Sequence, residues 1–154
     1  MSYALGEKSL AKLAGVHPGL AKVVKRAIEL TEQDFAVHDG LRTPEQQAAL
    51  VKAGASKTLK SMHLPQADGL GHAVDLVPYI NDQLRWEWPP LFKIAVAVDA
   101  AAAELGVKLR WGGVWDRTMD QYGGSAAAME AEVKAYCVRH PGPDFIDGPH
   151  FELA

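Results

Sequence analysis

Cysteine is nearly absent from this sequence, and it also lacks long apolar runs and an excess of positive charge. The one cysteine, Cys137, excludes an internal disulfide and any metal site built from several cysteines. The longest apolar run, IAVAVDAAAA, is interrupted by Asp99. Such a run is much shorter than the roughly 20 apolar residues that cross a bilayer, so we expect no membrane insertion. The formal net charge of −3 gives no indication of nucleic acid as a partner.

The N-terminal stretch MSYALGEKSLAKLAGVHPGL has neither the charged start nor the continuous apolar segment of a signal peptide. We therefore expect a protein made in the cytoplasm without such a peptide. With 154 residues, 48% of them apolar, the chain can form one domain with a full core. Because no linker, repeat or low-complexity tract divides it, we expect a single domain over residues 1–154, and a monomer.

Helical periodicity dominates the first third of the chain, and short strands alternate with helices after it. Thr43, Pro44 and Gln46 form the pattern of a capping box at the start of one helix. The predicted helices cover 9–14, 18–30, 44–53, 89–105 and 126–139, and the predicted strands cover 34–38, 73–78, 107–111 and the segment after residue 147. This order predicts an α+β fold in which helices flank a small antiparallel sheet.

A carboxylate interrupts one of these strands. Asp75 lies in the middle of Ala73-Val74-Asp75-Leu76-Val77-Pro78, which is otherwise apolar enough to be buried. A buried carboxylate needs a cation or several hydrogen-bond donors, because an unpaired charge in a core costs several kcal/mol. Backbone N–H groups, Arg42, Arg110 and a metal ion are the candidates for this partner.

Strand alternation places a histidine where it could meet that carboxylate. In the terminal strand, His150 and Glu152 share one face, and the apolar residues between and after them share the other. Asp75 likewise points to the opposite face from its apolar neighbours. If the two strands pair, Asp75 and His150 converge on one face of the sheet.

A third metal ligand is available from the glycine-rich loop before Asp75, where either His63 or His72 could supply it. Two imidazoles and one carboxylate form a typical catalytic zinc set that leaves one position for water. Asp147, three residues before His150, adds a second carboxylate where a general base would be needed.

Four segments resemble one family of enzymes. GLRTPEQQAAL, SMHLPQADGLGHAVDLVPY, RWGGVW and DGPHFEL, in this order over residues 40 to 153, are similar to the zinc peptidases of bacterial peptidoglycan. That family includes phage endolysins that cut L-alanyl-D-glutamate, D-alanyl-D-alanine carboxypeptidases, and the D-Ala-D-Ala dipeptidases of vancomycin resistance. The resemblance implies a zinc site on the face of the sheet.

Carried over by position, the resemblance implies that His63, Asp75 and His150 bind Zn²⁺. It also implies that Asp147 is the catalytic base and that Arg42 stabilises the oxyanion. A fixed guanidinium suits the second role, because it meets negative charge as the charge develops.

Five further residues are candidates for supporting roles. Ser61 matches a family serine near the metal, and Glu152 could orient a metal ligand without binding the metal itself. His72 remains the alternative to His63, because the PQADG stretch between the first histidine and the aspartate looks like an insertion. Trp111 and Trp115 flank a double glycine and could line a substrate cleft or pack in the core. The segment 116–146 is longer than the matching connection in simple endolysins, and its role is open.

The Asp-x-Pro-His-Phe-Glu arrangement that begins at Asp147 resembles that of the L-alanyl-D-glutamate endopeptidases. Dipeptidases of the family usually have glutamate at this position. We therefore expect an enzyme that cuts the peptide stem of peptidoglycan as a phage endolysin, acting in the periplasm after release through a holin. A D-Ala-D-Ala carboxypeptidase and a non-catalytic, zinc-stabilised binding module are the alternatives.

Overall fold

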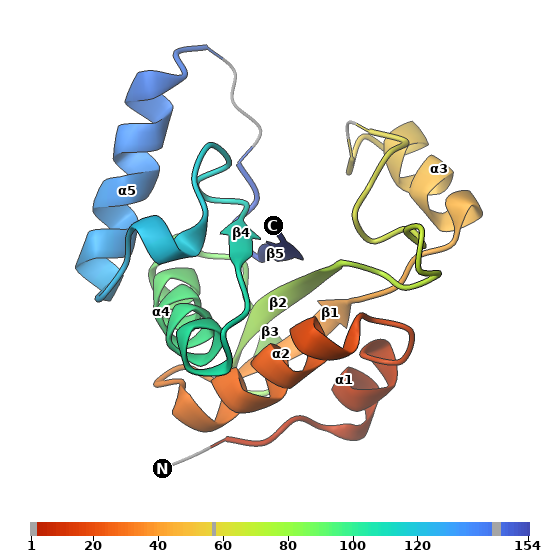
Figure 1. Ribbon diagram of the computed structural model, residues 1–154, viewed down its shortest axis with the longest axis horizontal. Helices are drawn as coiled ribbons and strands as arrows, with labels where there is room; N and C mark the ends of the chain where they lie inside the picture. Colours follow the sequence, from red (N-terminus) through yellow and green to blue (C-terminus); the bar gives the residue numbers. More distant parts are fainter. Residues whose placement is uncertain (1–2, 57, 143–145) are drawn as a thin grey trace.

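A small antiparallel sheet lies near the centre of the molecule (Figure 1). The computed structural model describes residues 3–56, 58–142 and 146–154. The strands are β1 (Phe35–Asp39), β2 (Ala73–Ile80), β3 (Gln83–Leu84), β4 (Leu109–Trp111) and β5 (His150–Leu153). Their order is β1-β2-β5-β4, with the short β3 paired to β2, and these strands all pair antiparallel. The α+β class predicted from the sequence is confirmed.

Most of the helices gather around the sheet, and α3 lies apart from the others (Figure 1). The helices are α1 (Glu7–Lys12), α2 (Pro18–Leu30), α3 (Pro44–Lys52), α4 (Trp88–Leu105) and α5 (Ala126–Arg139), with a 3-10 turn, η1, at Met119–Gln121. Helix α1 contacts β1, α4 contacts β2 and β4, and both α2 and α5 pack on α4. Helix α3 is found at the upper right of the view.

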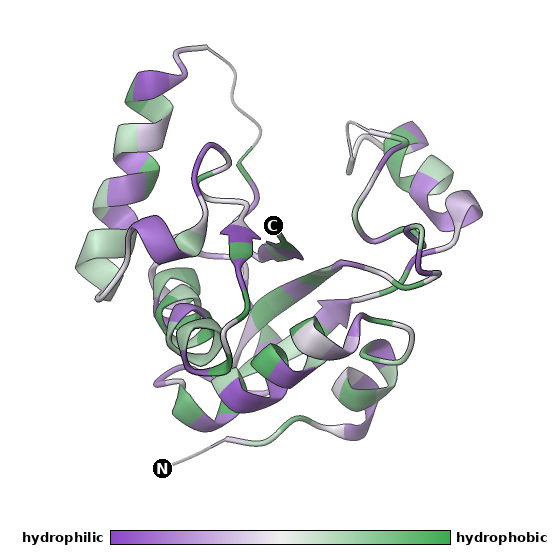
Figure 2. Ribbon diagram, viewed as in Figure 1, coloured by the Kyte–Doolittle hydropathy of each residue, from purple (hydrophilic) through white to green (hydrophobic). Residues whose placement is uncertain are grey.

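The core lies between the sheet and the helices α2 and α4. Val74 and Leu76 of β2 and Phe151 of β5 are fully buried, and Trp111 of β4 stacks on Phe151 with 6.3 Å between ring centroids. In Figure 2 green, hydrophobic residues are concentrated on α4 and β2. Because side chains alternate along a strand, this apolar face leaves the residues between them to the opposite face of the sheet.

Local signals in the sequence account for most helix ends. The Thr43 capping box is present, Ser125 accepts a hydrogen bond from the N–H of Ala128, and Gly106 ends α4 with a φ of 69°. Strand β4 begins two residues later than expected, because the N–H of Val107 still bonds to Ala102 of α4.

Helix α1 and strand β3 also differ from expectation. Helix α1 begins at Glu7 and ends at Lys12 rather than covering 9–14. Strand β3 was not predicted, and it forms a hairpin with β2 through Asn81 and Asp82, which have φ values of 51° and 61°. Asn and Asp tolerate this left-handed conformation better than other non-glycine residues. Within the described ranges, no helix is long and apolar enough to cross a membrane.

Candidate active site

Strand pairing brings Asp75 and His150 together. Strands β2 and β5 are neighbours, and Asp75 lies directly opposite His150 in their register. The Nδ1 atom of His150 is 3.4 Å from Oδ1 of Asp75, and both residues are buried. The convergence that depended on this pairing is therefore present.

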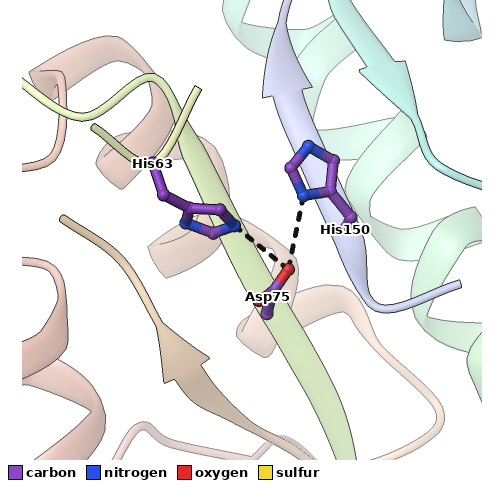
Figure 3. Close-up of side chains that lie close together, drawn as sticks. All are labelled: His63, Asp75 and His150. Atoms are coloured by element: carbon purple, nitrogen blue, oxygen red, sulfur yellow. Dashed lines mark ion pairs between the residues drawn. The ribbon is translucent and has the colours of Figure 1, made fainter. Parts of the chain in front are cut away.

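His63 approaches the same oxygen from the loop before β2 (Figure 3). Its Nε2 is 3.3 Å from Oδ1 of Asp75, and the residue is only 1% exposed. Its Nδ1 is 2.7 Å from the carbonyl oxygen of Gly40, which can only accept, so Nδ1 carries the hydrogen. Gly40 approaches α1 so closely that a Cβ atom there would lie 2.0 Å from the carbonyl oxygen of Lys12.

The three side chains suit a metal ion. One ligand atom from each of His63, Asp75 and His150 lies within 4.8 Å of the others. Glu152 accepts a hydrogen bond from Nε2 of His150 at 2.8 Å, so Nδ1 of this ring faces Asp75 and, in the neutral ring, offers its lone pair there, as does His63 Nε2. Among the described residues, neither His63 Nε2 nor Asp75 Oδ1 has a hydrogen-bond partner. Two ring nitrogens and a carboxylate oxygen placed in this way could hold a cation between them, either a proton on His150 or a metal ion that displaces it.

Electrostatics of the buried cluster also favours a cation. Burial alone would lower the pKa of His150, but the carboxylates of Asp75 and Glu152 outweigh it and raise this pKa to about 9. Burial would raise the pKa of Asp75, yet His150 and His63 hold it well below its usual range. The aspartate therefore stays ionised, as a metal ligand must.

Arg42 pairs with the second oxygen of Asp75. Its Nη2 is 3.1 Å from Asp75 Oδ2, its Nε donates to the carboxylate of Asp39, and its Nη1 donates to Gln47 at 2.9 Å. The backbone N–H of Arg42 also donates to the carbonyl of His63 at 2.8 Å. Arg110, the other candidate cation for Asp75, has a buried Nε that bonds to none of the described residues.

Asp147 lies in the turn that leads into β5. Its N–H donates to the carbonyl of Gly112 at 2.9 Å, and the N–H of Gly112 donates to the carbonyl of His150 at 2.8 Å. Burial, and then the charge of Asp75, raise the pKa of Asp147 above its ordinary value. In the part of the chain that the structure describes, no hydrogen-bond donor is paired with the Asp147 carboxylate, which leaves it available to a substrate or a water molecule.

A cleft of about 470 Å³ opens over these side chains. Trp115 lines it with its ring centroid 5.2 Å from that of His150, and Trp86 meets His38 edge-on at 5.1 Å. The remaining lining residues are Asp39, Arg42, Leu50, Ala55, Ser56, Thr58, Lys60, Ser61, Met62, His63, Asp75, Asp147, Pro149, His150 and Glu152.

The supporting residues are placed in different surroundings. Ser61 lines the cleft and accepts a hydrogen bond from the N–H of His63 at 3.1 Å. His72 lies outside the cluster, with its Nε2 2.8 Å from Asp68, so the structure brings His63 and not His72 to Asp75. Trp111 is fully buried and donates to the carbonyl of Gly148 at 2.7 Å. The sequence left open whether Trp111 lines a cleft or packs in the core. The structure shows it in the core, where its ring completes the apolar layer under β5.

Neither long connection contributes to the cleft within the described residues. The PQADG stretch forms a surface turn in which the N–H of Gly69 donates to Gln66. Asp116, near the start of segment 116–146, pairs with Arg139 at the end of α5 and with His140. Residues 143–145 of this segment lie outside the described part of the chain.

Two residues that hold Arg42 were not identified from the sequence. Asp39 lies across from Asp75 in the register of β1 and β2, and Gln47 is the buried residue of α3. The signal for Gln47 was its spacing from Arg42, but glutamine is ordinarily an exposed residue.

Three comparisons with known proteins agree. The family described as phage L-alanyl-D-glutamate peptidase matches residues 1–154. The L-alanyl-D-glutamate peptidase of Escherichia phage T5 is 36% identical over 126 residues, which are 79% of this chain and 88% of that protein. The crystal structure of a Serratia marcescens L-Ala D-Glu endopeptidase matches with a TM-score of 0.70 and 33% identity, over 100% of this chain and 90% of the other. This chain therefore belongs to the phage L-alanyl-D-glutamate peptidase family.

Proposed function

We propose that this protein is a zinc-dependent endopeptidase that hydrolyses the L-alanyl-D-glutamate bond in the peptide stem of peptidoglycan. The observation that carries this proposal is the presence, in one cleft, of the group His63, Asp75 and His150 together with Asp147 and Arg42. A structural metal site would need neither a second carboxylate nor a guanidinium beside it. The choice of the L-alanyl-D-glutamate bond as the one cleaved follows the names of the relatives.

The ligand set supports zinc as the metal. Two neutral imidazoles and one ionised carboxylate are the donors of many catalytic zinc sites, and Gly40 and Glu152 hold the two rings in the required tautomers. Zinc bound there would act as a Lewis acid that polarises the scissile carbonyl and acidifies a water molecule.

Asp147 is proposed to accept the proton of the attacking water. The water oxygen bonds to the alanine carbonyl carbon, the C–N bond to D-glutamate breaks, and Asp147 passes the proton to the leaving amine. A carboxylate with a raised pKa holds the proton more firmly than an ordinary one, which suits this transfer at neutral pH.

Arg42 is proposed to stabilise the oxyanion. A guanidinium has five N–H groups, and Asp39, Gln47 and Asp75 take one from each nitrogen. Two N–H groups remain on a side chain that lines the cleft and is fixed at three points. A donor held in this way stabilises developing negative charge without having to reorganise.

The family and this proposal together suggest an endolysin that acts on the cell wall during phage lysis. The test is mass spectrometry of purified Gram-negative peptidoglycan after digestion with the zinc-loaded protein. We expect released peptides that begin at D-glutamate, and glycan strands that retain L-alanine.

Two other results would overturn the assignment. Loss of only the terminal D-alanine would identify a carboxypeptidase. Unchanged peptidoglycan in the presence of bound zinc would identify a binding module, and would remove the catalytic roles proposed for Asp147 and Arg42.

A further inference from the structure

Gln47 is buried in an unusual place. The other residues of helix α3 are exposed or half-buried, yet Gln47 is only 1% exposed. Its Oε1 accepts from Nη1 of Arg42 at 2.9 Å, and its Nε2 donates to Oγ of Ser56 at 2.9 Å and to the carbonyl of Thr58 at 2.7 Å. A buried amide with three partners is a fixed part of the structure and not an idle surface group.

The chemistry of these partners determines how the amide points. Arg42 can only donate, so the amide oxygen must face it, and the carbonyl of Thr58 can only accept, so the amide nitrogen must face that side. No other uncharged side chain of this length presents an acceptor and two donors at one end. Gln47 thus joins a donor that precedes α3 in the chain to acceptors that follow it.

The first branch of this network leads to the metal ligands. The carboxylates of Asp39 and Asp75 lie opposite each other on β1 and β2, and Arg42 bonds to both. Gln47 holds the third nitrogen of the same guanidinium. It therefore helps to set the position from which Arg42 holds Oδ2 of Asp75 and leaves Oδ1 to the histidines.

The second branch leads to the wall of the cleft, to which Ser56 and Thr58 belong. Among the described residues, no other helix or strand packs extensively against α3, and Gln47 is the only residue of the helix that is buried. Packing of α3 against other helices and strands therefore contributes little to fixing this wall. The hydrogen bonds from Gln47 connect it to Arg42 and through Arg42 to the sheet.

We propose that Gln47 is a positioning residue that fixes Arg42 against Asp75 and, through Ser56 and Thr58, fixes one wall of the substrate cleft. This inference rests on the proposed function, because it assigns Gln47 to the support of that reaction. Its two branches use different ends of one amide, so two substitutions can separate them.

The experiment compares three variants of the zinc-loaded protein. Gln47→Met removes both branches at similar volume. Gln47→Glu keeps an acceptor for Arg42 but, when ionised, has no donor for Ser56 and Thr58. Gln83→Met is the matched control, because it makes the same change at an exposed glutamine of β3 that does not line the cleft. The measurements are kcat and KM on a stem peptide, and zinc affinity by chelator competition, all below the unfolding temperature of each variant.

We expect Gln47→Met to lower kcat and zinc affinity about tenfold each, the lower end of the effect of residues that orient metal ligands. We expect Gln47→Glu to restore kcat and zinc affinity to within about threefold of the control, and to raise KM, because the acceptor for Arg42 returns but the wall does not. Rescue of this kind would not follow if Gln47 served only to fold α3.

Three results would overturn the proposal. The first is a Gln47→Met variant with kcat, KM and zinc affinity equal to those of Gln83→Met. The second is equal damage to kcat in Gln47→Glu and Gln47→Met, and the third is an unchanged KM in Gln47→Glu. If the wild-type protein cut no stem peptide, the proposed function would fail, and zinc affinity alone would still decide whether Gln47 supports Asp75.

Discussion

Asp75 and Asp147 are carboxylates in one cleft whose surroundings shift their pKa values in opposite directions. Burial acts on both, but His150 and His63 outweigh it at Asp75, whereas at Asp147 the charge of Asp75 adds to it. Such a divergence separates a group that stays ionised from one that exchanges a proton. At the scale of single residues, Asp75 is suited to hold a cation and Asp147 to act as a base.

Replacing Asp147 with alanine tests this division of roles. We expect Asp147→Ala to keep its zinc and its fold, and to lose hydrolysis by a factor of about 10²–10⁴, the usual contribution of a general base. Zinc content and the rate of stem-peptide cleavage are the measurements. Glu130→Ala, which removes an exposed carboxylate of α5, is the control. Unchanged hydrolysis in Asp147→Ala would remove this residue from the mechanism.

At the scale of elements, the double glycine after β4 positions the Asp147 turn. Gly112 exchanges backbone hydrogen bonds with Asp147 and His150, and a Cβ at this position would lie 2.1 Å from the carbonyl oxygen of Asp147. Only glycine lets the two segments come so close. Gly112 therefore acts on the Asp147 turn through its backbone, and Trp111 supports the same turn from the core.

We expect Gly112→Ala to destabilise the fold by about 1–3 kcal/mol, because one of the two backbones must move. We also expect a lower kcat, since the segment that yields carries Asp147. Thermal unfolding and steady-state kinetics test both effects. Gly6→Ala is the control, because none of the described atoms lies within 4 Å of a Cβ there. Equal stability and activity in the two variants would show that the close approach of Gly112 to Asp147 affects neither folding nor catalysis.

Elements with local signals were predictable from the sequence. The helix that follows Thr43, the end of α4 at Gly106 and the face alternation around Asp75 all depend on a few neighbouring residues. The hairpin at Asn81 was missed because its turn lacks the glycine that usually marks such a turn. The start of β4 was misplaced because the N–H of Val107 still bonds to Ala102 of α4, and the sequence did not show how far this helix continues.

The site was predictable only in part, because its parts lie far apart in the sequence. The alternation of side chains along a strand predicted the faces on which Asp75 and His150 lie. The sequence did not predict that β2 pairs with β5. The choice between His63 and His72 depended on the path of a loop. The spacing of Gln47 from Arg42 was too weak a signal, because Gln47 is held by Ser56 and Thr58 of the segment that follows α3.

At the scale of the whole molecule, one carboxylate should make stability depend on pH. Asp99 of α4 is partly buried next to η1. Burial, and then the charge of Asp120, raise its pKa to about 6 from an ordinary 3.8. The folded state therefore binds this proton more tightly than the unfolded state. Its contribution is fully present below about pH 4 and is lost as the pH rises through about 6.

We expect Asp99→Asn to be more stable than the wild type at pH 8 by about 1 kcal/mol, after allowing for partial exposure, and to match it near pH 4. Urea unfolding of the two proteins at both pH values measures the difference. Asp82→Asn, with the same charge change at an exposed turn, is the control. A gain that is equal in both variants, or equal at both pH values, would contradict this account.

His63, Asp75 and His150 are proposed to hold the zinc ion on which hydrolysis depends. Elemental analysis of zinc per chain in the wild type, His150→Ala and His72→Ala tests this proposal most directly, with circular dichroism to confirm that each variant is folded. We predict one zinc per chain in the wild type and in His72→Ala, and its loss in folded His150→Ala. Normal zinc content in His150→Ala, or loss of zinc in His72→Ala alone, would contradict the proposed ligand set.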